Sequence, residues 1–162
     1  MVNEYTLSRE WPELNDLRAD LDREERRRHE ERERERRLRA ERLVLCRELL
    51  EGTDAVHLLR LMNEHLLSGR GVVEQSEEQL RESSAAARLR WLGPERDDGT
   101  HGGESLEIAV IAATTPEGEA FLSVLGDSTV ARGVRTQAEL KGALIRAVRH
   151  PGRLGSGQRP AG

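Results

Sequence analysis

The histidines and paired acidic residues are the side chains of this chain that could hold a metal ion. His57 and His65 are eight residues apart, so on a helix they lie near one face but two turns apart, too far to chelate one ion directly. Asp97, Asp98 and His101 stand in a glycine-rich acidic segment, which is typical of a solvated loop. We therefore expect no metal site and no cofactor.

The single cysteine, Cys46, cannot form a disulfide within the chain. It stands at helical spacing beside Leu45 and Leu49, which favours a small packed side chain over a reactive thiol. The absence of a disulfide framework fits a reducing compartment. The first residues show no apolar signal-peptide region and no apolar stretch is long enough to span a bilayer, so the sequence predicts a cytoplasmic protein without a membrane partner.

Ser128 is the one residue that suggests nucleophilic catalysis. The segment 121–133, FLSVLGDSTVARG, resembles the first sequence block of the GDSL esterase family, and that resemblance would make Ser128 the nucleophile. The family also needs a downstream asparagine and an Asp-x-x-His motif. No asparagine follows Asn63, and the only downstream histidine, His150, has Ala147 three positions before it. Without a base and an oxyanion donor a serine is not activated, so we expect an ordinary turn and no enzyme.

A long charged helix is the clearest element of the sequence. Hydrophobic residues make up 36% of the chain, charged residues 35% and aromatic residues 2%, a composition that argues against one large core. Residues 12–51 predict a helix, with Pro12 in its first turn and Gly52 at its end. Acid-to-base pairs with favourable i,i+4 orientation recur along it: Asp22–Arg26, Glu24–Arg28, Glu30–Arg34, Glu33–Arg37 and Glu35–Arg39.

A heptad frame runs along this helix, with leucines at both ends and charges in the middle. Its a positions include Leu14, Leu21 and Leu49, and its d positions include Leu17, Leu38 and Leu45. A coiled coil needs apolar a and d positions over three or four heptads, which the charged centre interrupts. Two interpretations stay open: a solitary helix that acts as a spacer, or self-association through the leucine ends.

The rest of the N-terminal region, residues 1–92, predicts two shorter helices. In a helix of residues 53–68, apolar side chains would cover most of the circumference, so this helix must be buried. Residues 76–92 follow a Ser76-x-x-Gln79 capping-box pattern and predict a third helix. We expect the second helix to pack between the third and the leucine-rich end of the first, around residues 43–50.

A small α+β module is expected after a linker at 93–104. Strands are predicted at 105–114, 119–125 and 129–134, followed by a helix at 137–149 that opens on a Thr136-x-x-Glu139 capping box. Residues 151–162 predict a disordered tail. The expected fold class is therefore mainly α: a long charged helix, two shorter helices and a C-terminal antiparallel ββ(β)α unit at 105–150.

Residues 105–149 also resemble the HicB-type antitoxin domain. The matching residues are Ile108–Ala113, Gly118-Glu119-Ala120, Ala131, Gly133, Thr136, and Leu140, Ala143 and Leu144. The resemblance implies a regulatory module that binds a partner protein, with a separate oligomerising or DNA-binding element. The loop of this chain departs from the family, because Leu125-Gly126-Asp127 replaces its usual Pro-Gly-Cys-like segment.

The C-terminal end is basic, and its arginines include Arg132, Arg135, Arg146 and Arg149. Such a cluster could contact phosphate backbones, although aromatic interleaving and DNA-binding motifs are absent. The sequence therefore predicts a non-catalytic oligomerising adaptor or regulatory interaction protein, whose partner is a second copy or another protein. The alternative is a nucleic-acid-associated regulator, the antitoxin-like case included.

Overall fold

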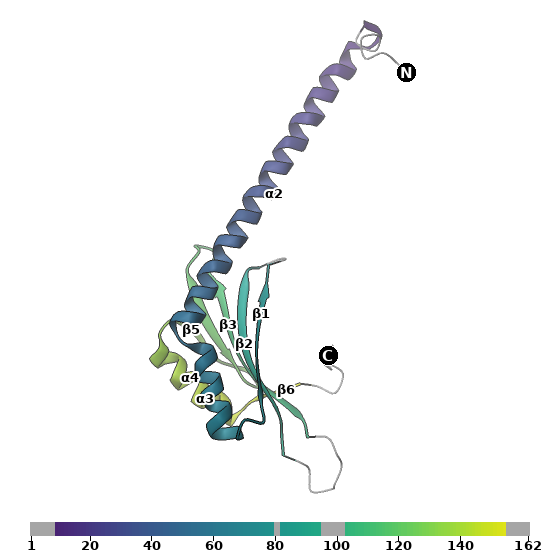
Figure 1. The fold of residues 1–162 in the computed structure, drawn as a ribbon. Helices are drawn as coiled ribbons and strands as arrows, with labels where there is room; N and C mark the ends of the chain where they lie inside the picture. The colour runs from purple at the N-terminus through teal and green to yellow at the C-terminus, as the bar shows by residue number, and fades with distance from the viewer. Residues whose placement is uncertain (1–8, 80–81, 95–102, 155–162) are drawn as a thin grey trace. The chain divides into compact units, whose positions relative to one another are not determined.

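A computed structural model describes residues 9–79, 82–94 and 103–154 of the chain (Figure 1). The chain divides into two compact units, residues 1–38 and residues 39–162. The first unit holds most of helix α2 (Pro12–Gly52), and the second holds the end of that helix together with a sheet and two further helices. Each unit is described by itself.

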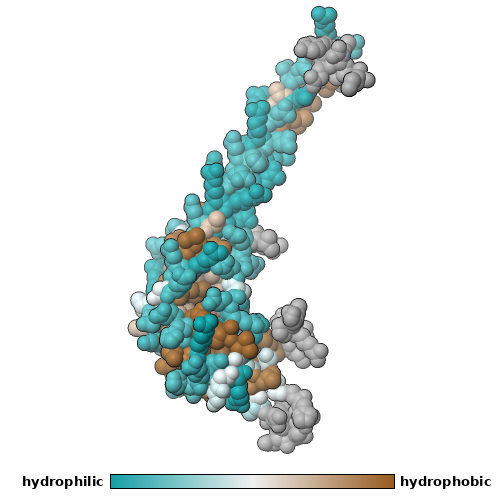
Figure 2. All heavy atoms as spheres, in the orientation of Figure 1, coloured by the Kyte–Doolittle hydropathy of each residue, from teal (hydrophilic) through white to brown (hydrophobic). Residues whose placement is uncertain are grey.

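Helix α2 confirms the predicted long helix, which was placed at 12–51. Within the first unit its charged side chains pair one turn apart: Arg28 Nη2 lies 2.6 Å from Glu24 Oε1, and Arg36 Nη1 lies 3.0 Å from Glu33 Oε1. No described side chain of the first unit is buried. Its surface is largely hydrophilic, with small hydrophobic patches (Figure 2). This part of the helix is therefore stabilised by ion pairs between neighbouring turns and not by burial in a core.

The second unit is built on one six-stranded antiparallel sheet. Its strands are β1 (Val72–Glu78), β2 (Ser84–Leu92), β3 (Ser105–Thr114), β4 (Ala120–Leu125), β5 (Thr129–Val134) and β6 (Gly152–Leu154). The first five follow one another in chain order, and β6 pairs with β3. The fold is therefore α+β, and the prediction of a mainly α protein with a small C-terminal module is wrong.

The predicted third helix at 76–92 does not exist, because this segment forms β1 and β2. Ser76 is not a helix cap; it lies in β1 opposite Ala86 of β2. Three consecutive alanines at 85–87 have high helix propensity, but propensity is overridden where a strand can pair with β1 and β3 on both sides. The alternation of Arg88 and Arg90 with Leu89 and Trp91 has the two-residue period of a strand with one face in the core.

The predicted linker and the predicted tail also have other roles. Gly93 N donates to Glu104 O at 2.8 Å, and Leu92 faces Ser105 across the ladder. Residues 93–104 therefore join two neighbouring strands of one sheet and do not separate two domains. The expected disordered tail begins with β6, whose Arg153 faces Leu106 of β3; residues 155–162 lie outside the described part.

The C-terminal strands and helix agree with the sequence. Strands β3 and β5 have the predicted bounds, β4 begins one residue later than expected, and α4 spans Gln137–Arg149. Thr136 caps α4, since its hydroxyl accepts a hydrogen bond from Glu139 N at 3.3 Å. This capping box is confirmed because it depends only on residues three apart in the chain.

Both short helices cover the same face of the sheet (Figure 1). Helix α3 (Ala55–Leu67) packs on β1 and β2, and α4 packs on β3, β4 and β5. The helix predicted at 53–68 is confirmed, but its cover is not a third helix: Leu58 and Leu59 enter the core above the sheet, while Leu66 stays 56% exposed. From α2, only Leu43, Cys46 and Leu50 are buried, so the predicted contribution of 43–50 to this core is confirmed.

Candidate interaction surfaces

The leucines of the predicted heptad frame remain largely on the surface of α2. Leu17 and Leu21 are 52% and 57% exposed, and Leu38 and Leu45 are 46% and 39% exposed. Leu14 is half-buried, and Leu49 packs partly against the core. These leucines occupy the apolar positions of one heptad frame, so this leucine stripe, defined by the six residues named here, is a candidate interface.

The three fully buried side chains of α2 are at positions outside the leucine stripe. Leu43, Cys46 and Leu50 are spaced by three and four residues and face the sheet. At the frame position between Leu38 and Leu45, Arg42 donates from Nη2 to Pro116 O at 3.1 Å. The guanidinium group of Arg42 is therefore hydrogen-bonded to the turn between β3 and β4.

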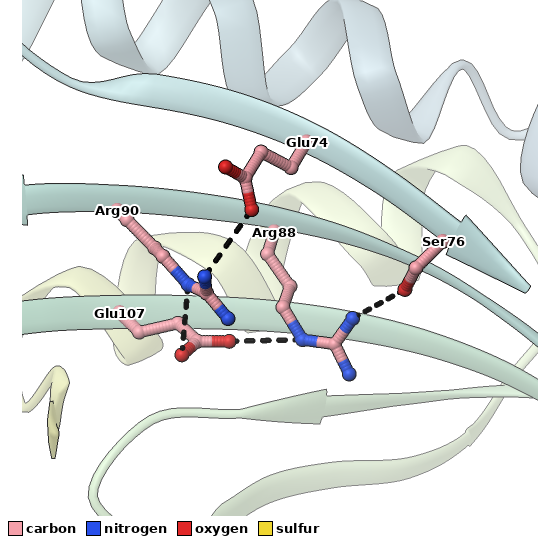
Figure 3. A network of polar contacts seen from close by, with 5 residues as sticks. All are labelled: Glu74, Ser76, Arg88, Arg90 and Glu107. Atoms are coloured by element: carbon pink, nitrogen blue, oxygen red, sulfur yellow. Dashed lines mark hydrogen bonds and ion pairs between the residues drawn. The ribbon is translucent and has the colours of Figure 1, made fainter. Parts of the chain in front are cut away.

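A second candidate surface lies on the face of the sheet opposite the helices (Figure 3). Arg88 and Arg90 are two residues apart on β2 and so share this face. Glu107 of β3 accepts from both: its Oε1 lies 3.0 Å from Arg88 Nε, and its Oε2 lies 3.3 Å from Arg90 Nε. Arg90 Nη1 also reaches Glu74 Oε2 at 3.2 Å, and Arg88 Nη1 donates to Ser76 Oγ at 2.6 Å.

This arginine network is half-buried and electrically balanced. The side chains of Arg88, Arg90 and Glu107 are 28%, 26% and 13% exposed. Within this network each arginine uses its Nε and Nη1 atoms, so Nη2 is the donor that the network does not use. Because Glu107 already fixes the two guanidinium groups, binding would cost little further side-chain entropy, and arginine is enriched among residues that dominate interface energies.

Sequence reasoning missed this network. The signal was present in the alternating Arg88 and Arg90 on one strand and in Glu107 on the next. Recognising it requires the strand register that sets Arg90 opposite Glu107, which the helical prediction for 76–92 excluded.

The four predicted basic residues do not form one cluster. Arg132 of β5 and Arg146 of α4 line a shallow hollow of about 430 Å³, together with Glu139. Arg135 pairs with Glu119 at 2.9 Å. Arg149 lies elsewhere, in a hollow of about 380 Å³ near β6. The structure therefore brings two of the four arginines together and separates the others.

A hollow of about 820 Å³ lies between the end of α2, α3 and the edge strand β1. It is lined by charges of both signs, among them Asp54, His57 and Arg60. Across it Arg47 forms an ion pair with Glu77, whose second oxygen lies 2.6 Å from Arg47 Nη2. The hydrogen bond from Arg47 lowers the pKa of Glu77. Such a balanced, open hollow favours protein contact over capture of one charged ligand.

The residues considered for chemistry occupy structural positions. Ser128 is exposed in the bend between β4 and β5, and its Oγ lies 3.3 Å from Asp127 Oδ1. The bend is explained by packing: Asp127 N donates to His150 O at 2.8 Å, and a Cβ on Gly126 would lie 2.3 Å from that oxygen. Within the described ranges, the Ser128 hydroxyl forms no hydrogen bond with a histidine, lysine or arginine side chain.

Metal-binding geometry is also absent from the described residues. His57 and His65 are exposed on α3, and no group of three histidine, cysteine or carboxylate side chains in the described ranges converges on one point. The candidates at 97, 98 and 101 lie outside those ranges.

Cys46 confirms the expectation of a packed side chain. It is fully buried, and its thiol lies 3.8 Å from Ser83 O. Burial raises the pKa of this thiol, which makes it a poor nucleophile at neutral pH. Ser83 in turn donates from Oγ to Arg39 O at 2.6 Å, so both residues fasten the β1–β2 connection to α2.

Among the helices of the described residues, none combines the length and the apolar character needed to cross a bilayer. Comparison with known proteins adds no relative: no family model, curated protein or solved structure matches the chain.

Proposed function

We propose that this chain is a non-catalytic interaction protein of the cytoplasm that self-associates through the leucine stripe of α2. The observation that carries the proposal is the exposure of Leu17, Leu21 and Leu38 on a helix that otherwise carries charge. Burying a leucine side chain contributes about 1.5–3 kcal/mol relative to leaving it in water, and a second copy offers an apolar surface of the same kind.

The role of the sheet in this proposal is to present a regulatory surface. Its helix-free face carries the arginine network of Arg88, Arg90 and Glu107. This face holds charged groups in fixed positions, which suits recognition of a partner protein.

The experiment is the molecular mass of the full chain in solution, measured by sedimentation equilibrium over a range of concentrations. The parent chain should have a multiple of the 18.2 kDa monomer mass, and Leu21→Glu should return it to the monomer. Ile145→Glu is the matched control, because Ile145 of α4 is 58% exposed and Leu21 is 57% exposed. A parent that stays monomeric at every concentration contradicts the proposal.

A second candidate function is nucleic-acid-associated regulation, which includes the antitoxin-like possibility. It is favoured by Arg132 and Arg146, which line one hollow beside the edge strand β5. Binding of nonspecific duplex DNA should then weaken steeply with salt, and Arg132→Ala with Arg146→Ala should reduce it. Arg135→Ala is the control, since Arg135 is already paired with Glu119. DNA binding that is absent at low salt removes this candidate.

A further inference from the structure

We propose that two copies of α2 pair antiparallel, with Leu21 of one copy facing Leu38 of the other. The inference rests on the proposed self-association and adds its orientation and register. It follows from the heptad frame defined by Leu14, Leu17 and Leu21, from the charges in the centre of that frame, and from the contacts that α2 already makes.

A parallel pair would set like charges against each other throughout the centre of the helix. In that arrangement every a or d residue meets its own copy. Glu24, Glu31 and Glu35 would each face a glutamate, and Arg28 and Arg42 would each face an arginine. Like charges that face each other at core positions are costly, because pairing removes part of their hydration while each charge is repelled by its own copy.

An antiparallel pair relieves much of this repulsion. In this orientation a residues meet d residues of the other copy. When Leu21 faces Leu38, the same register sets Arg28 against Glu31, an opposite-charge contact that occurs twice by symmetry. Glu24 against Glu35 remains a like-charge contact, and it also occurs twice by symmetry.

The same register keeps leucine against leucine at both ends. Leu14 then faces Leu45, which is 39% exposed and so accessible to a second copy. Leu17 faces Arg42, whose guanidinium is already turned to Pro116 O, so its aliphatic stem and not its charge lies beside the leucine.

A register shifted by one heptad is less suitable. It would set Leu17 against Leu49 and Glu24 against Arg42. Leu49 is already packed partly against the core, and Arg42 is held by the β3–β4 turn. The shifted register therefore depends on Leu49, which already packs against the core. It also sets Arg28 against Leu38 and so loses the contact of Arg28 with Glu31.

Disulfide trapping in the full chain tests the orientation. The variants Leu21→Cys, Leu38→Cys, Leu45→Cys and Val44→Cys are each made in a Cys46→Ala background. Two cysteines cross-link only when their Cα atoms are within about 7 Å. In the proposed pair, Leu21 of one copy lies about 25 Å along the axis from Leu21 of the other, at 1.5 Å per residue. A mixture of Leu21→Cys and Leu38→Cys should therefore cross-link after mild oxidation, and neither variant alone should.

The control is Val44→Cys, because Val44 is 46% exposed on the same helix but outside the frame; its mixture with Leu21→Cys should stay uncross-linked. Cross-linking of Leu21→Cys with itself would show a parallel pair and overturn the inference. Cross-linking of Leu21→Cys with Leu45→Cys would show the shifted register and overturn it too. In both cases the parent chain remains a dimer, so the proposed function stands; a monomeric parent overturns both.

Discussion

Replacement of Leu59 by alanine should remove a large part of the stability of the second unit. Leu59 of α3 is fully buried in the core above the sheet. Truncation of a buried leucine costs about 2–5 kcal/mol, depending on how far the surroundings collapse into the cavity, and a small domain has only about 5–15 kcal/mol in total. Leu66→Ala is the matched control, because Leu66 lies on the same helix but is 56% exposed.

The measurement is urea unfolding of the full chain, at one fixed protein concentration because association adds to apparent stability. The fluorescence of Trp91 reports on the core, against which it packs. Trp11, which is 57% exposed, is replaced by phenylalanine throughout. With a slope of about 1.5 kcal/mol per molar urea, Leu59→Ala should lower the midpoint by about 1–3 M, and Leu66→Ala should change it little. Equal midpoints for the two variants would refute the packing of α3 on the sheet.

Three further outcomes test other parts of the structure by the same unfolding assay. Thr136→Ala should cost about 0.5–2 kcal/mol, because the cap of α4 is lost; an unchanged midpoint would contradict the cap. Glu107→Ala should lower the free energy of unfolding by about 1–3 kcal/mol, since two half-buried guanidinium groups lose their shared acceptor. Glu74→Ala removes a carboxylate that is 53% exposed and should lower it by less than about 1 kcal/mol. Equal losses for the two variants would contradict the central place of Glu107. In the folded chain Arg47 lowers the pKa of Glu77. The Arg47–Glu77 pair therefore adds stability above the ordinary glutamate pKa of about 4.3, and this stability is lost as the pH falls through the lowered pKa. Glu77→Gln should reduce this loss of stability in acid, and an unchanged pH profile would show that the pair contributes nothing.

The C-terminal half of the fold was predictable because its signals are local. Thr136 and Glu139 are three residues apart and mark the start of α4 without reference to other strands. Gly118 stands between β3 and β4 with a φ of +89°, a conformation that suits glycine, and it lies between the strands predicted at 105–114 and 119–125. Strand and helix bounds in this region therefore agree with the structure.

The segment 76–92 was mispredicted because its deciding interactions are distant in the chain. A capping pattern at Ser76 and an alanine run at 85–87 both favour a helix when read locally. The strand is selected by pairing with β3, which lies beyond residues 93–104. Only the alternation of Arg88 and Arg90 with apolar residues indicated the strand, and it is short.

The two candidate surfaces also differ in whether the sequence could predict them. The leucine stripe could be predicted because a heptad frame depends on one helix alone. The arginine network could not, since it joins β1, β2 and β3 and requires their register. A surface built on a single element is visible in a sequence, whereas a surface built across a sheet becomes visible only with the pairing.

The core of the second unit includes neither Leu17 nor Leu21, which leaves these exposed leucines available for another chain. Ala85 and Ala87 of β2 are buried in the core cluster, to which α2 contributes Leu43, Cys46 and Leu50. The second unit therefore completes its core with Leu43, Cys46 and Leu50, whereas Leu17 and Leu21 belong to the first unit and are exposed. Pairing and folding should be separable: Leu21→Glu should change the mass in solution, but at concentrations where the parent is also monomeric it should leave the urea midpoint of the Trp91 signal unchanged. A lowered midpoint there would show that the leucine stripe is needed for folding, and the stripe would then be no independent interface.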